Sequence, residues 1–377
     1  MTRILYLADG ASVHTRKWIR ALTDQDYVIH LFSLNRFNPA DYGDKNNGFS
    51  YEEYSVTKNR EILGGINKLN YLPMLKVLKK AIEKFRPDIL HAHFASSYGR
   101  LAARSGFHPT IISVWGSDVF HFPRRSCIHK QILKMNLQAA DRILSTSEVM
   151  AKETGRYTPK RVEVTPFGVD TDIFYPHKES TKKNYSQMYK DGFIIGTAKS
   201  LENKYAIDDL IEAFILLNNK YPLEKMQLVI AGKGSAESQL KDLVYKKGIK
   251  DRVMFIGQID HREIPGFYNA IDVFAALSLE ESFGVAVIEA SACAKPVVVS
   301  DAGGLPEVVE KDITGYIVPR RDPQAAADAL ERLFLNRSLR THMGKAGRER
   351  VIKMYEWKQS VRQMLNIYQT LLTEANR

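Results

Sequence analysis

Short runs of apolar residues alternate with longer segments of helical periodicity along the first half of the chain. The runs have the length of buried strands, and the segments between them repeat apolar residues at helical spacing. The predicted strands are Ile4–Leu7, Val28–Phe32, Ile89–His93, Thr110–Val114, Arg142–Ser145 and Val162–Thr165, and the predicted helices include Thr15–Leu22, Tyr71–Phe85 and Ile128–Ala140. Because strands separated by helices form right-handed βαβ units, this half predicts a parallel sheet covered on both faces.

The same alternation begins again after a polar interval at 176–192, which is rich in Lys, Ser and Tyr and predicts a linker. The second set of predicted strands is Phe193–Thr197, Gln227–Ala231, Val253–Ile256, Val273–Ala275, Pro296–Ser300 and Tyr316–Val318. The second set of helices is Ile207–Asn218, Ala236–Lys246, Val285–Ala292, Pro323–Leu335, Ser338–Met354 and Trp357–Glu374. The 377 residues therefore predict two doubly wound α/β domains, with ligands at the C-terminal ends of the strands and in the cleft between the domains.

The net charge of +11 belongs to the first half of the chain. Residues 1–190 hold 29 Lys and Arg against 18 Asp and Glu, whereas residues 191–377 hold 25 of each kind. Such a difference indicates that one half faces an anionic partner. We find no basic helix-turn-helix, zinc-finger or aromatic RNA-binding signature, so we expect no nucleic acid. An anionic membrane surface and an anionic acceptor are the two partners that remain.

The composition is that of a soluble globular protein, with 44% hydrophobic and 26% charged residues. No apolar run approaches the ~20 residues that span a bilayer, and the N-terminus lacks the apolar core of a signal peptide. The two cysteines, Cys127 and Cys293, belong to no metal-type pair and are expected to be free thiols. We therefore expect a cytoplasmic protein, either free or peripheral on the inner face of the membrane.

One predicted helix, at 71–86, is both amphipathic and basic. Its apolar residues recur at positions 71, 74, 75, 78, 82 and 85, which is the spacing of one helical face. This stripe either packs in the core and leaves the lysines in water, or it lies on a membrane that carries a lipid-linked acceptor. Arg124 and Arg125 form a second basic patch, close in sequence to Phe120 and Phe122.

Two glutamates eight residues apart, Glu281 and Glu289, surround the predicted start of a helix near Gly284. The first turn of a helix has free N–H groups that favour negative charge, and glycine lets the backbone approach a ligand closely. A carboxylate inside this helix can accept two hydrogen bonds from a vicinal diol such as a ribose. Taken alone, however, such a pair is most often two surface glutamates.

The surrounding sequence reads Glu281-Ser-Phe-Gly-x4-Glu289 and, farther on, Gly303-Gly-x-Pro-Glu-Val-Val309. It resembles family 4 of the retaining GT-B glycosyltransferases, whose E-x7-E element and G-G-x-P-E-V-V loop both occur here in register. Further matches are Val164–Pro176, Ile230–Gly234, Arg252–Gly257, Thr314–Pro319 and Trp357–Tyr368. The resemblance is strong over residues 160–370 and weaker before them. It implies a GT-B fold, with an acceptor domain at 1–175, a donor domain at 190–355 and a last helix at about 356–377 that returns to the first domain.

The resemblance also implies a role for individual residues of the second domain. Glu289 would hold the ribose hydroxyls of a nucleotide-sugar donor, expected to be UDP-linked, and Glu281 would contact hydroxyls of the sugar. The remaining donor contacts would come from the backbone of Ser282, Phe283, Gly284 and Val285, and from Gly232. Lys199 and Lys204 would neutralise the donor diphosphate. Lys199 stands where the family usually has arginine, so it supplies a charge but not a bidentate planar fork.

This arrangement predicts catalysis by charge stabilisation. The two lysines and the helix N-terminus would stabilise the charge that grows on the diphosphate as the glycosidic bond breaks. No protein nucleophile is required if the acceptor attacks from the side that the nucleotide leaves, because the departing phosphate oxygen can take the acceptor proton. We identify no Asp-x-Asp metal motif of the kind that other glycosyltransferases use. The sequence therefore predicts no cofactor and no metal, only a nucleotide-sugar co-substrate.

The segment Gly10-Ala-Ser12-Val-His14 follows the first strand and opens a helix, which is an arrangement that favours phosphate. We expect Gly10 and Ser12 to contact the donor phosphate. The segment is not the G-x-G-x-x-G fingerprint of dinucleotide-binding domains, which argues against NAD or FAD. His14 is either a functional residue on the acceptor side or a polar cap near the helix start.

Three further residues follow strand ends of the first domain. His93 resembles the histidine that the family carries at a strand end, and it is expected to reach the cleft. A metal pair with His91 is disfavoured because no third ligand is apparent. Trp115 stands where relatives often have histidine beside the reacting sugar, which indicates an aromatic wall for the sugar or acceptor. Asp118 either orients a substrate hydroxyl or caps the following helix.

The sequence thus predicts a retaining, metal-independent transferase of hexosyl or N-acetylhexosaminyl groups. Its acceptor would be a hydroxyl of a glycan, a lipid-linked molecule or a small molecule, in the synthesis of a cell-surface polysaccharide, glycolipid or small glycoside. One alternative is a nucleotide-sugar epimerase of the same fold, but the acid–base residues that would eliminate the nucleotide are not apparent. The other is a non-catalytic glycan- or membrane-binding protein, against which the presence of Glu281, Glu289 and Lys204 argues.

Overall fold

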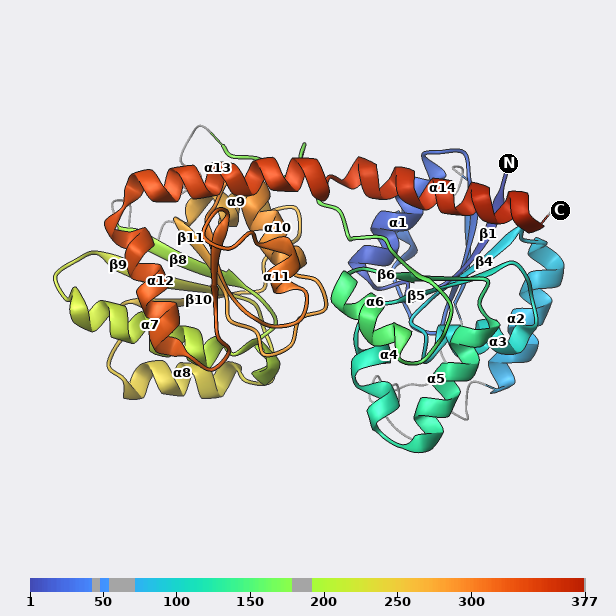
Figure 1. Ribbon diagram of the computed structural model, residues 1–377, viewed down its shortest axis with the longest axis horizontal. Coiled ribbons are helices and arrows are strands. Elements are labelled where there is room, and N and C mark those ends of the chain that lie inside the picture. The colour runs from blue at the N-terminus through green and yellow to red at the C-terminus, as the bar shows by residue number, and fades with distance from the viewer. Residues whose placement is uncertain (43–47, 54–71, 178–191, 376–377) are drawn as a thin grey trace. The chain divides into compact units, whose positions relative to one another are not determined.

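The computed structural model describes residues 1–42, 48–53, 72–177 and 192–375. The chain forms two compact units (Figure 1). Unit 1 comprises residues 1–166 and 360–377, and unit 2 comprises residues 167–359. Each unit is one parallel β-sheet whose strands are joined through helices, as the alternating sequence pattern predicts.

Unit 1 contains a seven-stranded sheet with the order β3-β2-β1-β4-β5-β6-β7. Its strands are β1 Arg3–Leu7, β2 Val28–Ser33, β3 Phe49–Glu53, β4 Ile89–His93, β5 Thr110–Val114, β6 Arg142–Ser145 and β7 Val162–Val164. Its helices are α1 Val13–Thr23, α2 Leu72–Phe85, α3 Tyr98–Ser105, α4 Ser117–Phe120, α5 Cys127–Ala139 and α6 Glu148–Gly155, with 3₁₀ turns η1 Pro39–Tyr42 and η4 Phe122–Arg124. The strand order reverses between β1 and β4.

Unit 2 repeats this plan with a six-stranded sheet of order β10-β9-β8-β11-β12-β13. Its strands are β8 Phe193–Ala198, β9 Met226–Ala231, β10 Val253–Gly257, β11 Val273–Ala276, β12 Val297–Ser300 and β13 Gly315–Val318. Its helices are α7 Ile207–Lys220, α8 Glu237–Lys246, α9 Ile264–Ala270, α10 Val285–Ala292, α11 Leu305–Val308, α12 Pro323–Leu335 and α13 Arg337–Met354, with the 3₁₀ turn η6 Asn203–Tyr205. Here the order reverses between β8 and β11.

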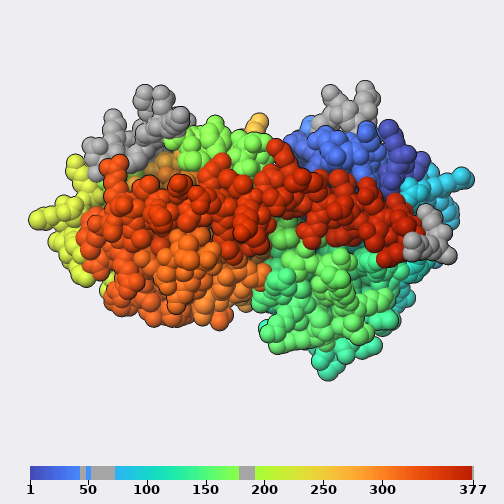
Figure 2. All heavy atoms as spheres, turned by 45° about the horizontal axis from the view of Figure 1, so that its top comes forward, coloured from blue at the N-terminus to red at the C-terminus, as the bar shows by residue number. Residues whose placement is uncertain are grey.

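The last helix, α14 (Trp357–Ala375), begins in unit 2 and lies mostly in unit 1 (red in Figures 1 and 2). Tyr368 and Leu371 on its inner face are buried. A hydrogen bond between the Tyr368 hydroxyl and Nδ1 of His91, at 2.7 Å, connects the helix to β4. The C-terminal helix is therefore an integral part of the first unit.

The boundary between the units lies earlier than residue 175, where the sequence places the end of the first domain. Val169 pairs with Glu356 in an isolated parallel bridge, and its amide donates to the carbonyl of Tyr355 at 2.8 Å. The Phe174 carbonyl accepts a hydrogen bond from Arg348. Residues 167–177 therefore fold with unit 2, because their backbone is held by α13 and the residues after it. Most of the predicted linker at 176–192 lies outside the described residues.

The basic helix α2 packs its apolar stripe into the core of unit 1. Leu78, Ala81 and Phe85 are buried in this core, with Met74 and Ile82 packed partly against it. Of the two interpretations of this helix, the structure supports the core interpretation. The start predicted at Tyr71 lies outside the described residues. None of the helices in the described part of the chain combines the length and apolar character needed to cross a membrane.

The pattern analysis does not list several short elements, among them β3, α3, α6, α9 and α11. Each is short, with eight residues or fewer. Strand β3 has the sequence Phe-Ser-Tyr-Glu-Glu and pairs with β2, at the edge of the sheet that the described residues form. Short elements of this kind carry too few repeats to show a period, so tertiary pairing decides them.

Candidate functional site

In unit 2, the neighbouring strands β8 and β11 come from distant parts of the sequence. Lys199 directly follows β8, and Glu281 lies in the loop after β11. This is the point where the strand order of the sheet reverses. Doubly wound sheets bind their ligands there, outside the carboxyl ends of the strands. The topology alone therefore brings these two predicted site residues together.

The side chains of Lys199 and Glu281 form an ion pair and are only 10% and 14% exposed. Burial by itself lowers the pKa of Lys199, but Glu281, Tyr205 and Glu289 together outweigh burial, so the pKa is raised. The ammonium nitrogen of Lys199 lies 5.2 Å from the centre of the Tyr205 ring, and that of Lys204 lies 5.0 Å from the same centre. Two cations thus lie around one aromatic ring, with the exposed Lys204 on the 3₁₀ turn after β8.

Two glycines lie directly against the backbone of Lys199 and Glu281. A residue with a side chain would not fit at either position. Gly232 has a φ of +140°, and a β-carbon there would lie 1.8 Å from the carbonyl oxygen of Lys199. Gly303 has a φ of +48°, and its β-carbon would lie 1.8 Å from the carbonyl oxygen of Glu281. The sequence predicts Gly232 as a donor contact. In the structure, the close approach of the Lys199 carbonyl explains why this residue is a glycine. Glycine is required at both positions for conformation and for space.

The N-terminus of α10 lies next to the Glu281 loop. Gly284 precedes the helix with a φ of +108°, and Val285 is its first residue. Of the other predicted contacts, Phe283 is buried with its ring 5.6 Å from that of Tyr355, whereas Ser282 is half-buried. The first turn of such a helix has amide groups without intrahelical partners, which favour an anionic ligand.

Glu289 lies in the second turn of α10 and is 9% exposed. One of its oxygens accepts a hydrogen bond from the Tyr268 hydroxyl at 2.9 Å. Burial, together with this carboxylate, raises the pKa of Tyr268 well above its usual value, so the hydroxyl stays a donor. The charge of Glu289 also helps to raise the pKa of Lys199. The three predicted residues Lys199, Glu281 and Glu289 therefore share one electrostatic site.

In unit 1, the carboxyl ends of β1, β4 and β5 carry an aromatic cluster. The ring of Trp115, which follows β5, lies 4.5 Å from that of His93 at the end of β4. The same indole lies 5.9 Å from the ring of His14, in the first turn of α1. Tyr6 on β1 contacts His93 at 4.6 Å between ring centres. The predicted residues His14, His93 and Trp115 are thus brought together where this sheet also reverses its strand order.

His91 and His93 lie on the same face of β4 but have different surroundings. His91 is fully buried, with Nδ1 at 2.7 Å from the Tyr368 hydroxyl and Nε2 at 2.7 Å from Oγ of Ser113. Burial lowers the pKa of His91 to about 3. Burial, with His91 and His14 nearby, lowers the pKa of His93 well below its usual value. Both imidazoles are therefore neutral, and His93 reaches the aromatic cluster rather than open solvent.

Asp118 does not have the geometry of a residue that contacts substrate. Its side chain is fully buried, and its oxygens accept hydrogen bonds from the amides of Ala95 at 2.8 Å, Gly116 at 2.8 Å and Trp115 at 3.1 Å. Burial raises its pKa, whereas these amides lower it. Of the two predicted roles, the structural one fits, because the carboxylate joins the loops after β4 and β5. We therefore describe Asp118 as a positioning residue and withdraw it from the catalytic set.

The phosphate contact predicted for Gly10 is also corrected. Its amide donates to Oγ of Ser33 at 3.0 Å, and its carbonyl accepts from the hydroxyl of Tyr42 at 2.7 Å. A β-carbon on Gly10 would lie 2.3 Å from the ring of Phe37, so the glycine is explained by packing. Ser12 is the N-cap residue of α1, although its side chain makes no capping hydrogen bond. Because Ser12 occupies the cap position, His14 is not the cap of this helix.

The sequence does contain two Asp-x-Asp spacings, Asp24-Gln25-Asp26 at the end of α1 and Asp170-Thr171-Asp172, which the expectation of a metal-free chain left out. In the structure, Oδ1 of Asp170 accepts the amide of Asp172 at 3.0 Å, and Asp172 pairs with Lys358 at 2.8 Å. Within the described ranges, no three His, Cys, Asp or Glu residues are grouped as metal ligands would be. The spacing at 170–172 is therefore accounted for by a turn and an ion pair, and Asp24 and Asp26 are exposed at the end of α1.

Tyrosines are the site residues that the sequence analysis did not identify. Tyr205 contacts both lysines with its ring, Tyr268 donates to Glu289, and Tyr368 shares a hydrogen bond with His91. None of the three tyrosines belongs to a sequence motif from which its partner could be predicted. Tyr268 is 21 residues from Glu289, and Tyr368 is 277 residues from His91. Only the folded chain brings these tyrosines to their partners.

Two family models match the chain. Residues 178–350 match the model described as "Glycosyl transferases group 1", and residues 3–147 match "Glycosyl transferase 4-like". The first covers most of unit 2 and the second covers most of unit 1. Both predicted domains are thus recognised independently of each other.

Similar curated proteins have related names. The chain is 30% identical over 239 residues to D-inositol 3-phosphate glycosyltransferase of Saccharomonospora viridis, covering 61% of this chain and 55% of that protein. It is 24% identical over 318 residues to N-acetyl-alpha-D-glucosaminyl L-malate synthase of Bacillus anthracis, covering 80% of each. The matches to several of the inositol-phosphate enzymes span only about half of their length.

Solved structures show the same fold. Sucrose-phosphate synthase from Thermosynechococcus elongatus superposes with a TM-score of 0.87 at 22% identity, covering 99% of this chain and 100% of that one. HepE of Anabaena, solved in complex with UDP-glucose, superposes with a TM-score of 0.81 at 16% identity, covering 98% and 100%. The GT-B fold that the motifs imply is thereby confirmed. With both domains matched by family models, the chain belongs to the family 4, group 1 glycosyltransferases.

Proposed function

We propose that this protein is an enzyme that transfers a hexosyl or N-acetylhexosaminyl group from a UDP-sugar to a hydroxyl acceptor with retention of configuration. Membership of the family supports transfer of a sugar. The UDP-glucose complex of HepE supports a UDP-linked donor. The acceptor would be a hydroxyl of a glycan, a lipid-linked molecule or a small molecule.

The observation that carries this proposal is the electrostatic site of Lys199, Glu281 and Glu289 beside the N-terminus of α10. A diphosphate would find there a lysine whose charge is secured by a raised pKa and a helix end whose amides favour anions. Glu289, oriented by Tyr268, would accept hydrogen bonds from the ribose diol. Glu281 would exchange part of its contact with Lys199 for hydroxyls of the sugar.

During transfer, the bond between the anomeric carbon and the phosphate oxygen breaks while the acceptor oxygen bonds to the same carbon. Charge grows on the diphosphate, where Lys199, Lys204 and the α10 amides would stabilise it. The acceptor attacks from the face that the nucleotide leaves, and the departing phosphate oxygen takes the acceptor proton. The configuration is retained without a protein nucleophile.

We also propose that the reaction needs no metal, because lysines and helix amides supply the charge stabilisation that a divalent cation supplies elsewhere. An unchanged rate in EDTA is the expected result. A strict requirement for a divalent ion would contradict this part of the proposal. In that case, Asp170→Asn with Asp172→Asn and, separately, Asp24→Asn with Asp26→Asn would test the two Asp-x-Asp spacings of the chain.

A thermal-shift screen of nucleotide sugars tests the donor site first, since a ligand that binds only the folded state stabilises it by mass action. We expect UDP-sugars to raise the melting temperature and Glu289→Gln to weaken that shift. Glu237→Gln, a substitution of a partly exposed helix glutamate that pairs with Lys241, is the matched control. If no nucleotide sugar shifts the melting temperature, the proposal fails.

Release of UDP then separates transfer from the two alternatives. A transferase releases stoichiometric UDP only when an acceptor is supplied. An epimerase would instead change the sugar without an acceptor, and a binding protein would show the thermal shift with no turnover. Analysis of the anomeric configuration of the product would test retention.

A further inference from the structure

The two lysines of the unit 2 site differ in exposure and in partner. Lys199 is only 10% exposed and forms an ion pair with Glu281, whose side chain is 14% exposed. Lys204 is exposed and forms no ion pair with any residue in the described part of the chain. An anion that reaches this site therefore finds one lysine available and the other shared with a carboxylate.

Backbone contacts hold the loops in place around this ion pair. The amide of Leu279 donates to the carbonyl of Lys204 at 2.8 Å, which joins the loop after β11 to the turn after β8. The amide of Gly304 donates to the carbonyl of Glu281 at 3.0 Å, and the amide of Lys199 donates to the last carbonyl of β9 at 3.1 Å. Because the backbone is held at both residues of the pair, a change of partner requires only rotation of their side chains.

The type of cation at position 199 favours exchange of one anion for another. A lysine ammonium group is a compact point charge with three N–H donors, whereas an arginine guanidinium group offers five donors in a planar fork. An arginine can therefore keep a carboxylate on one edge and bind a phosphate on another. This chain has Lys199 where the family usually has arginine, so we expect a phosphate and Glu281 to compete for one charge.

The second carboxylate of the site is in a different position. Glu289 accepts a hydrogen bond from Tyr268 at 2.9 Å, so it has a partner that a diphosphate would not remove. Its charge contributes less to the raised pKa of Lys199 than the charge of Glu281 does. Glu281 is therefore the group that an incoming diphosphate has to displace from Lys199.

We propose that Glu281 competes with the diphosphate for Lys199, and that this competition lets the site distinguish a nucleotide-sugar from the free nucleoside diphosphate. This role rests on the proposed transfer reaction, which places both the diphosphate and the sugar at this site. When a UDP-sugar binds, the phosphates take Lys199 and Glu281 turns to hydroxyls of the sugar, so both anions keep a partner. UDP alone brings no such hydroxyls. It leaves Glu281 unpaired beside the phosphates, and the repulsion between like charges weakens its binding.

The same competition acts on release of the product. After transfer, the sugar has left the site and UDP remains at Lys199. Glu281 has then lost the sugar hydroxyls and returns to Lys199, which weakens the contact with UDP. Lys204, which has no carboxylate partner, stays with the phosphates in both states. One ion pair thus favours binding of the donor over retention of the product.

Titration calorimetry of the full chain with UDP tests the competition. Glu281→Gln removes the competing charge and preserves the shape of the side chain. We expect this variant to bind UDP about tenfold more tightly than wild type, which is toward the lower end of the range usual for coupled binding events. Glu202→Gln is the matched control, because the Glu202 carboxylate lies in the loop after β8 but bonds to Ser235. Its UDP affinity should change about twofold or less.

The sugar nucleotide should respond differently from UDP. With the UDP-sugar that gives the largest thermal shift in the screen, the affinity of Glu281→Gln should stay within about twofold of wild type, because weaker contacts to the sugar offset the reduced repulsion. The preference of the site for the sugar nucleotide over UDP should therefore fall about fivefold. Such a change in preference is not expected from a variant that only alters the stability of the fold.

A second variant keeps both charges and tests the proposal if Glu281→Gln does not fold. The guanidinium group of Lys199→Arg can bind Glu281 and a phosphate together, so we expect this variant to bind UDP about threefold more tightly than wild type. A circular dichroism melt would verify the folding of each variant.

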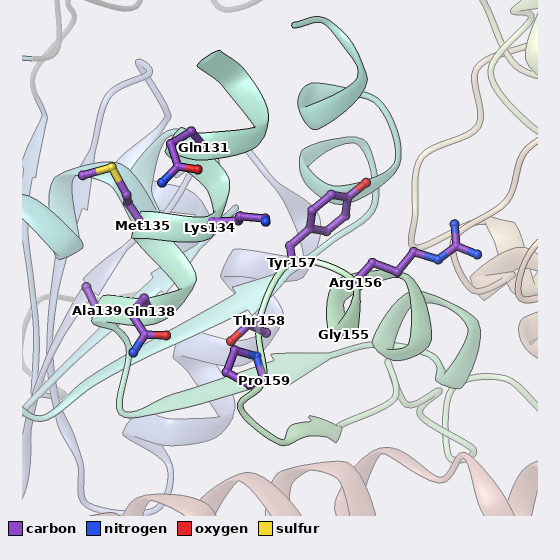
Figure 3. A pocket seen from close by; sticks show the side chains of 10 residues that line it. All are labelled: Gln131, Lys134, Met135, Gln138, Ala139, Gly155, Arg156, Tyr157, Thr158 and Pro159. Atoms are coloured by element: carbon purple, nitrogen blue, oxygen red, sulfur yellow. The ribbon is translucent and has the colours of Figure 1, made fainter. Parts of the chain in front are cut away.

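A groove in unit 1 provides a control for the location of nucleotide binding. It has a volume of about 750 Å³ and lies between α5 and the loop after α6, lined by Lys134 from the helix and Arg156 from the loop (Figure 3). Arg156 pairs with Glu153, whereas Lys134 is exposed. Because cations can also attract phosphates to this groove, Lys134→Gln tests whether UDP binds there. We expect the UDP affinity of this variant to equal that of wild type.

Three results would contradict the proposal. The first is a UDP affinity that is unchanged or lower in folded Glu281→Gln. The second is an equal gain in Glu281→Gln and Glu202→Gln, which would show that any loss of negative charge attracts UDP. The third is weaker UDP binding by Lys134→Gln, which would place the nucleotide in the groove of unit 1.

Failure of the proposed function would have a different signature. In that case, the wild-type protein would bind neither UDP nor any UDP-sugar. If the wild type binds UDP and transfers the sugar but neither Glu281→Gln nor Lys199→Arg binds UDP more tightly, the proposed function stands and the competition is wrong.

Discussion

The carboxyl edges of the two sheets have the same topology but contrasting chemistry. In unit 2, the point of strand reversal holds charges, with Lys199 paired to Glu281 and Glu289 held by Tyr268. In unit 1, the equivalent point holds neutral rings, namely Tyr6, His93 and Trp115. The first environment suits an anionic leaving group, and the second suits the faces of a sugar or acceptor. A repeated fold therefore supplies the location, and the loop residues supply the chemistry.

The largest expected effect comes from removing the cation of unit 2. Lys199→Met should lower kcat/KM about 10²–10³-fold, because the diphosphate loses a preorganised charge. It should also lower stability, since Glu281 stays 14% exposed without its partner. Measurement of UDP release tests the first effect and thermal unfolding the second. Lys233→Met, at an exposed lysine of a neighbouring loop, should change neither.

A double variant sharpens this prediction. Lys199→Met with Glu281→Gln should recover much of the lost stability, because no unpaired charge is left, but it should not recover activity. If activity returned together with stability, the role of Lys199 would be structural. The charged edge of unit 2 would then not be the source of catalysis.

The second largest effect is expected at Gly303, whose backbone lies against the carbonyl of Glu281. Gly303→Ala should cost roughly 3 kcal/mol and abolish the UDP-sugar thermal shift, since the residue has a φ of +48° and its new β-carbon would displace the Glu281 carbonyl. Gly266→Ala, in α9, meets no heavy atom within 4 Å and should stabilise the chain by about 0.5 kcal/mol. Normal donor binding in Gly303→Ala would show that the loop can move without loss.

A smaller effect is expected from the positioning residue of unit 1. Asp118→Asn should cost about 2 kcal/mol, because an amide cannot accept all three backbone hydrogen bonds that the carboxylate accepts. Donor binding, which is the task of unit 2, should remain within twofold of wild type, whereas transfer should fall as Trp115 moves. Asp24→Asn, on the surface of the same unit, is the control. A large loss of donor affinity would contradict this division of tasks.

The smallest effect is a difference in response to pH. The pKa of His91 is about 3 in the folded state against 6.5 in the unfolded state, so between these values the unfolded chain binds more protons. Protonation of His91 therefore destabilises the folded state. The effect is absent above pH 6.5 and lowers the free energy of unfolding by about 1.4 kcal/mol per pH unit as the pH falls towards 3. Hydrogen exchange should therefore show unit 1 loosening in mild acid. His91→Gln should reduce that slope, whereas His342→Gln, at an exposed histidine of unit 2, should not.

The sequence determined the elements and the family. Buried strands such as Ile89–His93 and Val297–Ser300 were predictable, because a short apolar run between two helical segments nearly always forms a strand. The segment from Glu281 to Glu289 and the loop from Gly303 to Val309 were also sufficient to carry the family resemblance, because each is continuous in the chain, whereas the two glutamates taken alone would read as surface residues.

The tertiary structure decided what depends on residues that are distant in sequence. Lys199 and Glu281 are 82 residues apart, and only the adjacency of β8 and β11 pairs them. The roles of Asp118 and Gly10 had to be corrected for the same reason, since backbone amides, hydroxyls and rings from other loops occupy their polar groups or their space. Local sequence specifies strands, helices and loops through interactions between residues that are close together in the chain. Partners across a parallel sheet are set by strand order, which periodicity along the chain does not encode.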